Sequence, residues 1–171
     1  KLIFIEKFLI LNNHKLNLNQ FPENYHLIAI HSDLDEFRLA FFLNKKLNIG
    51  LKRKNNDIYF SEQNANYSSY EFLDETKYLK WIFFSNKSLV SELPNVDDNG
   101  LFSSRSSVKN EISLLSNKKQ VDYFLIVENI ANKSYLEKVL KKISEIRGVI
   151  TSFVSDNKLE NKENLIFAWV I

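Results

Sequence analysis

The chain has 171 residues, of which 44% are apolar and 26% are charged, and it contains no cysteine. This length suits one domain that buries about two thirds of the surface of its unfolded chain, and the composition excludes a disordered protein. The formal net charge of +2 excludes a long-range attraction of the whole molecule to nucleic acid or to a membrane. The absence of cysteine excludes disulfides, thiolate zinc sites and cysteine nucleophiles.

The first 24 residues have the patterns of two short strands. Residues 2–11 are apolar but carry Glu6 and Lys7 in their middle, which favours a strand over a signal peptide. Leu16 and Leu18 alternate with polar residues, as in an edge strand. The chain has no run of about 18 apolar residues, so the sequence predicts no membrane-spanning helix. We therefore expect a cytoplasmic protein that does not contact a membrane.

A buried strand over residues 25–30 precedes the first predicted helix. Asp33 and Glu36 have the spacing of an N-terminal capping signature, which predicts a helix over residues 33–47 that ends before Gly50. The apolar arc of this helix contains Phe37, Leu39, Ala40, Phe41, Leu43 and Leu47. The same helical phase places Phe42 on the opposite side, among charged residues.

The middle of the chain has the patterns of short strands and turns. Residues 51–54 and 58–60 are strand-like and are separated by a polar turn. Residues 70–73 and 79–84 flank a polar loop of hairpin length. Residues 91–109 contain Pro94, Gly100 and a serine-rich run, which predicts a mobile loop before a short strand at residues 112–115.

Residues 121–154 predict a strand, a helix and a second strand. Residues 121–127 are apolar at nearly every position, as in the centre of a sheet. Ser134 with Glu137 matches a capping box and Gly148 is a helix stop, so we expect a helix over residues 133–147. Its buried stripe is Leu136, Val139, Leu140, Ile143 and Ile146. Residues 149–154 predict a strand with one face more exposed to solvent, and residues 165–170 predict a last strand.

Together these elements predict a single α+β domain over residues 1–171. Two main helices, at residues 33–47 and 133–147, pack on a mixed, mostly antiparallel sheet. The strand-helix-strand units are of the ferredoxin-like kind. Because short loops join each helix to its strands, the two strands of such a unit must run parallel with a right-handed crossover.

Several segments resemble a bacterial family named by the motif Ile-Pro-Glu-x-x-x-Val-Asp-Tyr. The similar segments are residues 27–32, 37–44, 52–53 and 121–125, which are spread over most of the chain. The chain departs from the first half of the motif, since Leu115, Ser116 and Asn117 stand where Ile-Pro-Glu would be. This family occurs in Bacteroidetes and has no assigned activity. The resemblance therefore implies a cytoplasmic bacterial protein, and it identifies no catalytic residue.

Acidic and histidine side chains gather where the strand at residues 25–30 meets the helix. His31, Asp33, Asp35 and Glu36 are candidates for metal binding or acid-base chemistry at the end of a strand. We favour a structural role, because acids in a first helical turn complement the helix dipole and the spacing of known cation loops is missing. His26 is expected to be packed or hydrogen-bonded. We expect no metal, no cofactor and no catalytic residue.

Basic residues near the end of the first helix are the candidate partner-binding set. The set comprises Arg38, Phe42, Lys45, Lys46, Lys52, Arg53 and Lys54. Such cations bind phosphates in a salt-sensitive way, and Phe42 or Tyr59 could stack on a base. An exposed aromatic residue beside arginine is also typical of protein-binding surfaces. The alternative is a solvated helix end whose cations complement the dipole.

Two functional classes follow from the sequence. The first is a non-catalytic interaction module that docks on a protein or an RNA through the rim of the first helix, with a homodimer as a further assembly. The second is a ferredoxin-like regulatory domain that binds a small molecule, although residues 129–133 lack the glycine usual in its strand-helix loop. An enzyme ranks third, because no two side chains show a nucleophile-base relation.

Overall fold

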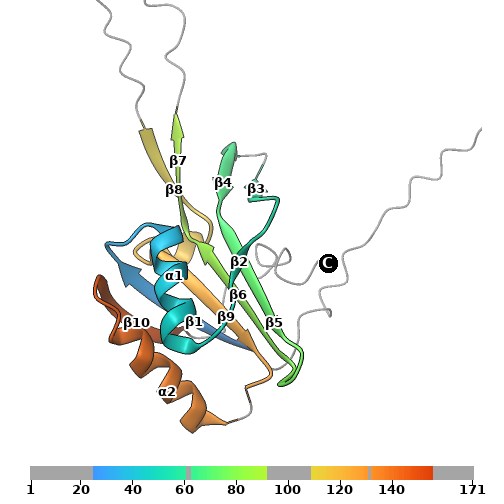
Figure 1. Ribbon diagram of the computed structural model, residues 1–171. Helices are drawn as coiled ribbons and strands as arrows, with labels where there is room; N and C mark the ends of the chain where they lie inside the picture. The colour runs from blue at the N-terminus through green and yellow to red at the C-terminus, as the bar shows by residue number, and fades with distance from the viewer. Residues whose placement is uncertain (1–24, 61–62, 92–108, 131, 156–171) are drawn as a thin grey trace, which may run out of the picture.

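A computed structural model describes residues 25–60, 63–91, 109–130 and 132–155 (Figure 1). The helices in these residues are α1 (Glu36–Leu47) and α2 (Lys133–Ser144), with a short 3-10 helix at Ser116–Lys118. The strands are β1 (Tyr25–Ser32), β2 (Lys52–Arg53), β3 (Ile58–Phe60), β4 (Ala65–Tyr67), β5 (Ser69–Asp74), β6 (Leu79–Ser85), β7 (Lys87–Ser91), β8 (Lys109–Ser113), β9 (Tyr123–Glu128) and β10 (Val149–Ser155). The predicted α+β class, with its mostly antiparallel sheet, is confirmed.

The main sheet has six strands in the order β10-β1-β9-β6-β5-β2, and its described pairings are antiparallel. β9 and β10 both pair with β1, which lies between them, so they run in the same direction on either side of it. α2 joins these two strands, as expected for a strand-helix-strand unit. In the other strand-helix-strand unit, which comprises β1, α1 and β2, the two strands are not neighbours, because β9, β6 and β5 lie between them. The predicted central position of residues 121–127 is confirmed by β9.

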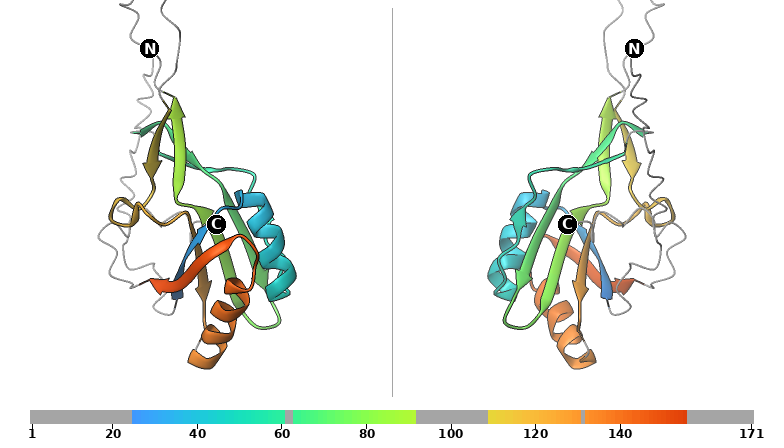
Figure 2. Two further views of the ribbon diagram at one scale, coloured as in Figure 1. Left: turned by 90° about the vertical axis from the view of Figure 1, so that its left-hand side faces the viewer. Right: turned by 90° about the vertical axis from the view of Figure 1, so that its right-hand side faces the viewer.

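Both helices cover the same face of the main sheet (Figure 2). Alternate strand residues point to this face, including Ile28 and Ile30 of β1 and Leu125 and Val127 of β9. The helical side chains buried against them include Leu39, Ala40 and Leu43 of α1 and Leu136, Val139 and Ile143 of α2. Burial of one such side chain contributes about 1.5–3 kcal/mol. Leu140, predicted in the same stripe, is only half-buried at the margin.

The opposite face of the main sheet belongs to a second apolar cluster. Its strand residues include Leu27, Ala29, Ile82, Phe84, Phe124 and Ile126. The β3–β4 hairpin contributes Ile58, Ala65 and Tyr67, and the segment before β9 contributes Leu114, Leu115 and Val121. The middle strands are therefore buried on both faces, which explains why residues 121–127 are apolar at nearly every position.

Two hairpins, β3–β4 and β7–β8, extend beyond the main sheet (Figure 1). The chain passes from β4 into β5 at Ser68 and from β6 into β7 at Asn86, so two long segments leave the main sheet at these residues. The backbone N–H of Ser85 donates to the carbonyl of Ser68 at 3.0 Å, beside this branch point. The predicted hairpin around residues 74–77 is confirmed as β5–β6, whereas the predicted turn at 55–57 joins strands of different sheets.

The helix ends differ from the predicted caps. α1 begins at Glu36 after Asp35, so the predicted start at Asp33 is wrong, and the Asp35 side chain makes no capping hydrogen bond. Asn48 ends α1 in the left-handed conformation, which asparagine tolerates, two residues before Gly50. The cap of α2 is Asn132, whose side chain accepts a hydrogen bond from the N–H of Ser134 at 2.9 Å. Asparagine caps a helix as well as serine does, so the capping-box spacing alone misplaced this cap.

Several predicted features lie outside the described residues. They are the strands predicted at residues 2–11 and 165–170, the edge strand within residues 12–24, and most of the loop predicted at residues 91–109. Neither helix in the described part of the chain is long and apolar enough to cross a membrane.

Gly148 lies at a close contact between the start of β10 and the start of α1. Its φ is +101°, and a Cβ atom at this position would lie 2.7 Å from Cγ of Leu34. We expect Gly148→Ala to lower the free energy of unfolding by at least about 2 kcal/mol, because backbone strain and overlap add. Thermal denaturation measures this as a fall of about 2–4 °C for each kcal/mol. Gly50→Ala is the control, since its φ is not positive and its nearest contact would be 3.3 Å, to the Phe72 ring. Equal losses in the two variants would contradict the expectation.

Candidate functional site

The basic residues of the predicted partner-binding set do not form one patch. Lys45 and Lys46 lie in the last turn of α1, whereas Arg53 on β2 lies 3.9 Å from Glu36 in the first turn (Nη1 to Oε1). Glu36 and Lys45 are separated by about 13 Å along a helix that rises 1.5 Å per residue. The chain reverses direction after α1, which carries Arg53 back toward the start of the helix.

Several of these cations already have acidic partners. Lys46 Nζ lies 3.5 Å from Glu145 Oε2 of the segment after α2. Lys54 Nζ lies 3.6 Å from Glu71 Oε2 of β5. Arg38, Lys45 and Lys52 form no ion pair within the described residues.

Arg53 is the most constrained cation of the set. Its Nη2 donates to both carboxylate oxygens of Asp57, at 2.9 and 3.0 Å, and these hydrogen bonds raise the pKa of the guanidinium. The guanidinium carbon also lies 5.9 Å from the centre of the Tyr70 ring. Arg53 is 48% exposed, but its guanidinium is already matched by the carboxylates of Asp57 and Glu36, so it is less suited to bind an anion than an unpaired cation.

Phe42 is not on the exposed side of α1, contrary to the helix phase predicted from the sequence. It is half-buried and packs against the first core cluster, whereas Phe37 and Phe41 are 60% and 62% exposed. Lys46 lies one turn after Phe42 on the same flank of α1, and its ion pair with Glu145 places the end of α2 beside this flank. The buried arc of α1 therefore extends from the sheet toward the second helix.

An aromatic surface with two cations therefore lies on α1, and we call it the α1 outer face: Phe37, Arg38, Phe41 and Lys45. Phe37 and Phe41 are one helical turn apart, so their rings are neighbours on the helix surface. The Phe41 ring meets the Phe42 ring edge to face, with 5.4 Å between centroids. The α1 outer face thus adjoins the first core cluster, which gives one of its two rings a fixed support.

The histidine and acidic candidates have structural partners or lie exposed. His31 Nδ1 lies 3.7 Å from Asp122 Oδ2. His26 Nε2 lies within hydrogen-bond distance, 3.1 Å, of the carbonyl oxygen of Ile130, which agrees with the predicted hydrogen-bonded role of His26. Asp33 and Asp35 are exposed. No three histidine, aspartate or glutamate side chains converge as a metal site in the part of the chain that the structure describes.

Asp122 and Tyr123, from the segment that resembles the family motif, join three elements. Asp122 accepts a hydrogen bond from the N–H of Ser32 at 3.1 Å and lies 2.9 Å from Lys87 Nζ on β7, a contact that raises the pKa of the lysine. The Tyr123 hydroxyl donates to the carbonyl of Leu34 at 2.7 Å, and burial raises its pKa. These residues fix the end of β1, the start of β7 and the turn before α1.

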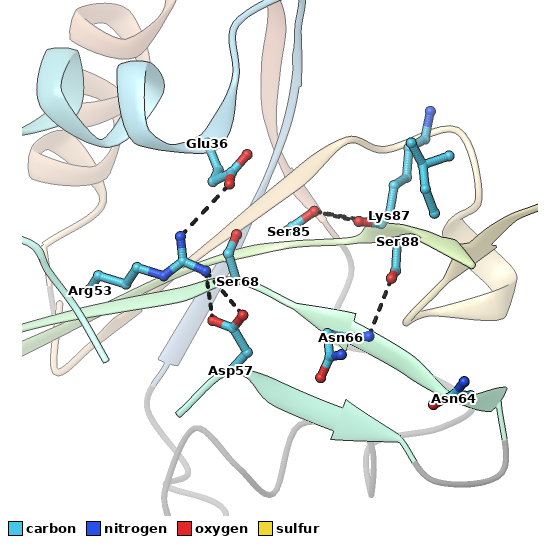
Figure 3. A pocket seen from close by; sticks show the side chains of 10 residues that line it. Glu36, Arg53, Asp57, Asn64, Asn66, Ser68, Ser85, Lys87 and Ser88 are labelled. Atoms are coloured by element: carbon cyan, nitrogen blue, oxygen red, sulfur yellow. Dashed lines mark hydrogen bonds and ion pairs between the residues drawn. The ribbon is translucent and has the colours of Figure 1, made fainter. Parts of the chain in front are cut away.

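A polar pocket of about 370 Å³ lies beside the branch point of the two long segments (Figure 3). Glu36 borders it from the first turn of α1, and Arg53 and Asp57 border it from β2 and the following turn. The side of β4 and the junction of β6 and β7 complete the lining. Of the predicted partner-binding set, only Arg53 lies at this pocket.

The pocket face of β4 follows the two-residue period of a strand. Ala65 and Tyr67 point into the second core cluster, while Asn64, Asn66 and Ser68 line the pocket. Tyr59 pairs with Asn66 across the β3–β4 hairpin. This polar and apolar alternation over residues 64–68 was the sequence signal for the pocket, but no predicted element covered it.

Comparison with protein-family models, with curated proteins and with solved structures finds no match to this chain. Membership of the family with the Val-Asp-Tyr motif therefore stays a prediction. Function has to be inferred from the α1 outer face and from the pocket.

The two neighbouring phenylalanines of α1 should respond differently to truncation. We expect Phe42→Ala to lower the free energy of unfolding by about 1–3 kcal/mol, because a half-buried ring leaves a cavity at the margin of the core. Phe41→Ala should cost less than about 1 kcal/mol, since most of its ring is already in water. Denaturant unfolding of the two variants measures the difference. A larger loss for Phe41→Ala would show that α1 is rotated relative to this structure.

Proposed function

We propose that this protein is a non-catalytic interaction module that docks an acidic, apolar segment of a partner protein on the α1 outer face. The observation that carries the proposal is the joint exposure of Phe37 and Phe41, 60% and 62%, one helical turn apart. Single exposed apolar residues are common, but two adjacent phenyl rings form a contiguous apolar surface. Aromatic side chains are enriched in the cores of protein interfaces.

The charges beside the rings indicate the chemistry of the partner. Arg38 and Lys45 lie on the same side of α1 as Phe37 and Phe41, and neither cation forms an ion pair within the described residues. A partner with carboxylates around an apolar centre would therefore gain complementary charge at the rim of the contact. Apolar residues at positions i and i+4 of a partner helix match the spacing of the two phenyl rings.

RNA fits this surface less well than an acidic protein segment. The affinity of a protein for nucleic acid rises with the number of phosphates that its cations neutralise. Lys46, Arg53 and Lys54 are already engaged by carboxylates, and only Arg38 and Lys45 lie beside the exposed rings. About two phosphate contacts would give weak binding, whereas burial of two rings favours a protein contact.

Selection of binding peptides from a displayed random library tests this proposal, because it requires no identified partner. We expect the selected peptides to combine aspartate or glutamate with large apolar residues. Their binding to the Phe37→Ala, Phe41→Ala double variant should be at least about tenfold weaker, because about 1.4 kcal/mol or more of apolar contact is lost. Binding should also weaken as salt is raised, in proportion to the screening of Arg38 and Lys45.

The matched control replaces two exposed apolar residues elsewhere, Ile150 and Val154 of β10, by alanine. This control variant should bind the selected peptides as the unchanged protein does, and both double variants should keep their melting temperatures within a few degrees. Peptides that bind the Phe37→Ala, Phe41→Ala variant undiminished would overturn the proposal. A pool of RNA oligonucleotides that binds through Arg38 and Lys45, with no peptide selected, would replace the protein partner by RNA.

A further inference from the structure

We propose that the polar pocket beside α1 binds a neutral, hydroxyl-rich small molecule of the saccharide or polyol class. This site is separate from the α1 outer face, because none of the four residues of that face lines the pocket. Its volume of about 370 Å³ falls within the range of small-molecule sites, about 300–1,000 Å³, near the lower end. A ligand of one or two sugar rings suits this size, and the charges of the lining decide against an anion of similar size.

The charges around the pocket favour a neutral ligand. Arg53 is held by both oxygens of Asp57 and lies 3.9 Å from Glu36, so this cation is already matched by carboxylates (Figure 3). Lys87 is paired with Asp122, which lies outside the lining. An anion would have to displace Asp57 from Arg53 beside the carboxylate of Glu36, and a cation would have to displace Arg53. Both exchanges lose a charge-assisted hydrogen bond or an ion pair.

The remaining lining offers paired donors and acceptors at short spacing. Asn64, Asn66 and Ser68 follow one another along one side of β4, and an amide or a hydroxyl group both donates and accepts. The side-chain amide of Asn66 makes no hydrogen bond within the described residues, and Asn64 uses its Oδ1 to accept from the Tyr59 hydroxyl at 3.2 Å. Ligand hydroxyl groups, which also donate and accept, are the natural partners of such a surface.

Ser68 differs from the other buried serines without a hydrogen-bond partner because it lines the pocket. Ser68 is only 8% exposed, and its Oγ is buried without a hydrogen-bond partner. An unmatched buried polar atom is unfavourable, so native proteins keep few of them. Figure 3 shows the Ser68 side chain directed into the space beside the Arg53 guanidinium and below Glu36. Ser68 Oγ is enclosed by the protein in this structure, and a turn of the side chain toward the pocket would let a ligand hydroxyl satisfy it.

Tyr59 adds a flat apolar surface on the same side of the β3–β4 hairpin. Tyr59 does not line the pocket itself, but it lies opposite Asn66 in the strand pairing, is 57% exposed, and donates its hydroxyl to Asn64 Oδ1. A sugar ring presents hydroxyl groups at its edge and C–H groups on its faces. The edge can therefore meet the polar side of β4 while one C–H face lies on the tyrosine ring, whose π face is negative.

NMR titration of the full chain with glucose, N-acetylglucosamine and myo-inositol as neutral probes tests the proposal. Inorganic phosphate is the anionic probe. We expect at least one neutral probe to shift the amide signals of Asn64, Asn66 and Ser68 with a dissociation constant in the millimolar range, and phosphate to leave them unchanged. No shift of these signals with any neutral probe, or a shift with phosphate alone, would overturn the proposal.

Two serine variants separate binding from folding. Ser68→Ala removes an unmatched buried hydroxyl, so we expect an unchanged or higher melting temperature together with about tenfold weaker binding of the neutral probe. Ser69→Ala is the control, because its Oγ is also buried without a partner but does not line the pocket. It should change the melting temperature in the same direction and leave binding intact. Equal affinities for the probe in the two variants would contradict the role of Ser68.

Discussion

Asn86 is the residue on which the junction between the main sheet and the β7–β8 hairpin depends. It is fully buried, and its backbone N–H donates to the carbonyl of Asp122 at 2.9 Å while its own carbonyl accepts from Leu114 at 2.8 Å. Its side-chain amide donates to the carbonyls of Lys118 and Val121, and its Oδ1 accepts from the N–H of Leu115. A buried amide is tolerated only when its polar atoms are matched, so this residue accepts one local arrangement. Residues 114–121 are thereby held over the second core cluster, and β7 is directed away from the main sheet.

The polar pocket forms where β4 and β7 diverge from the main sheet. The segment that contains β4 and β5 leaves the main sheet at Ser68, next to the point where β6 passes into β7, and a backbone hydrogen bond from Ser85 to Ser68 joins the two. Beyond that bond the β3–β4 hairpin faces α1 across a polar space rather than across packed apolar side chains. Asn66 N donates to the Ser88 hydroxyl at 3.3 Å, which keeps the two diverging segments close to each other. The polar pocket is therefore built into the branching of the fold.

The sequence predicted the strands and helices correctly where one face, or both faces, of an element are buried. It failed to predict which side chains are exposed where a neighbouring element determines the orientation. Residues 121–127 and 25–30 are apolar at nearly every position because both faces of β9 and β1 are covered, a pattern that local composition reveals. Phe42 could not be placed by periodicity, since the wide apolar arc of α1 fits two orientations and only the position of α2 chooses between them. Proximity in sequence likewise grouped Lys45 with Arg53, which the reversal of the chain places at opposite ends of α1. The pocket residues of β4 were missed because each is an ordinary polar residue. They form a pocket only because the fold places Ser85 and Glu36, which are distant in sequence, on its other sides.

The start of α1 contributes to both proposed sites, since Glu36 borders the pocket and Phe37 begins the α1 outer face. This end of the helix is firmly attached to the sheet. The Leu34 carbonyl accepts from the Tyr123 hydroxyl, and the Leu34 N–H donates to the Ser32 hydroxyl. The Leu34 side chain also closes over Gly148, where even an added methyl group would overlap it. Coupling through a rearrangement would need an element with two arrangements of similar free energy, and these contacts oppose a second arrangement of the helix start. The structure therefore favours two sites that bind independently, although only one residue step separates them along the chain.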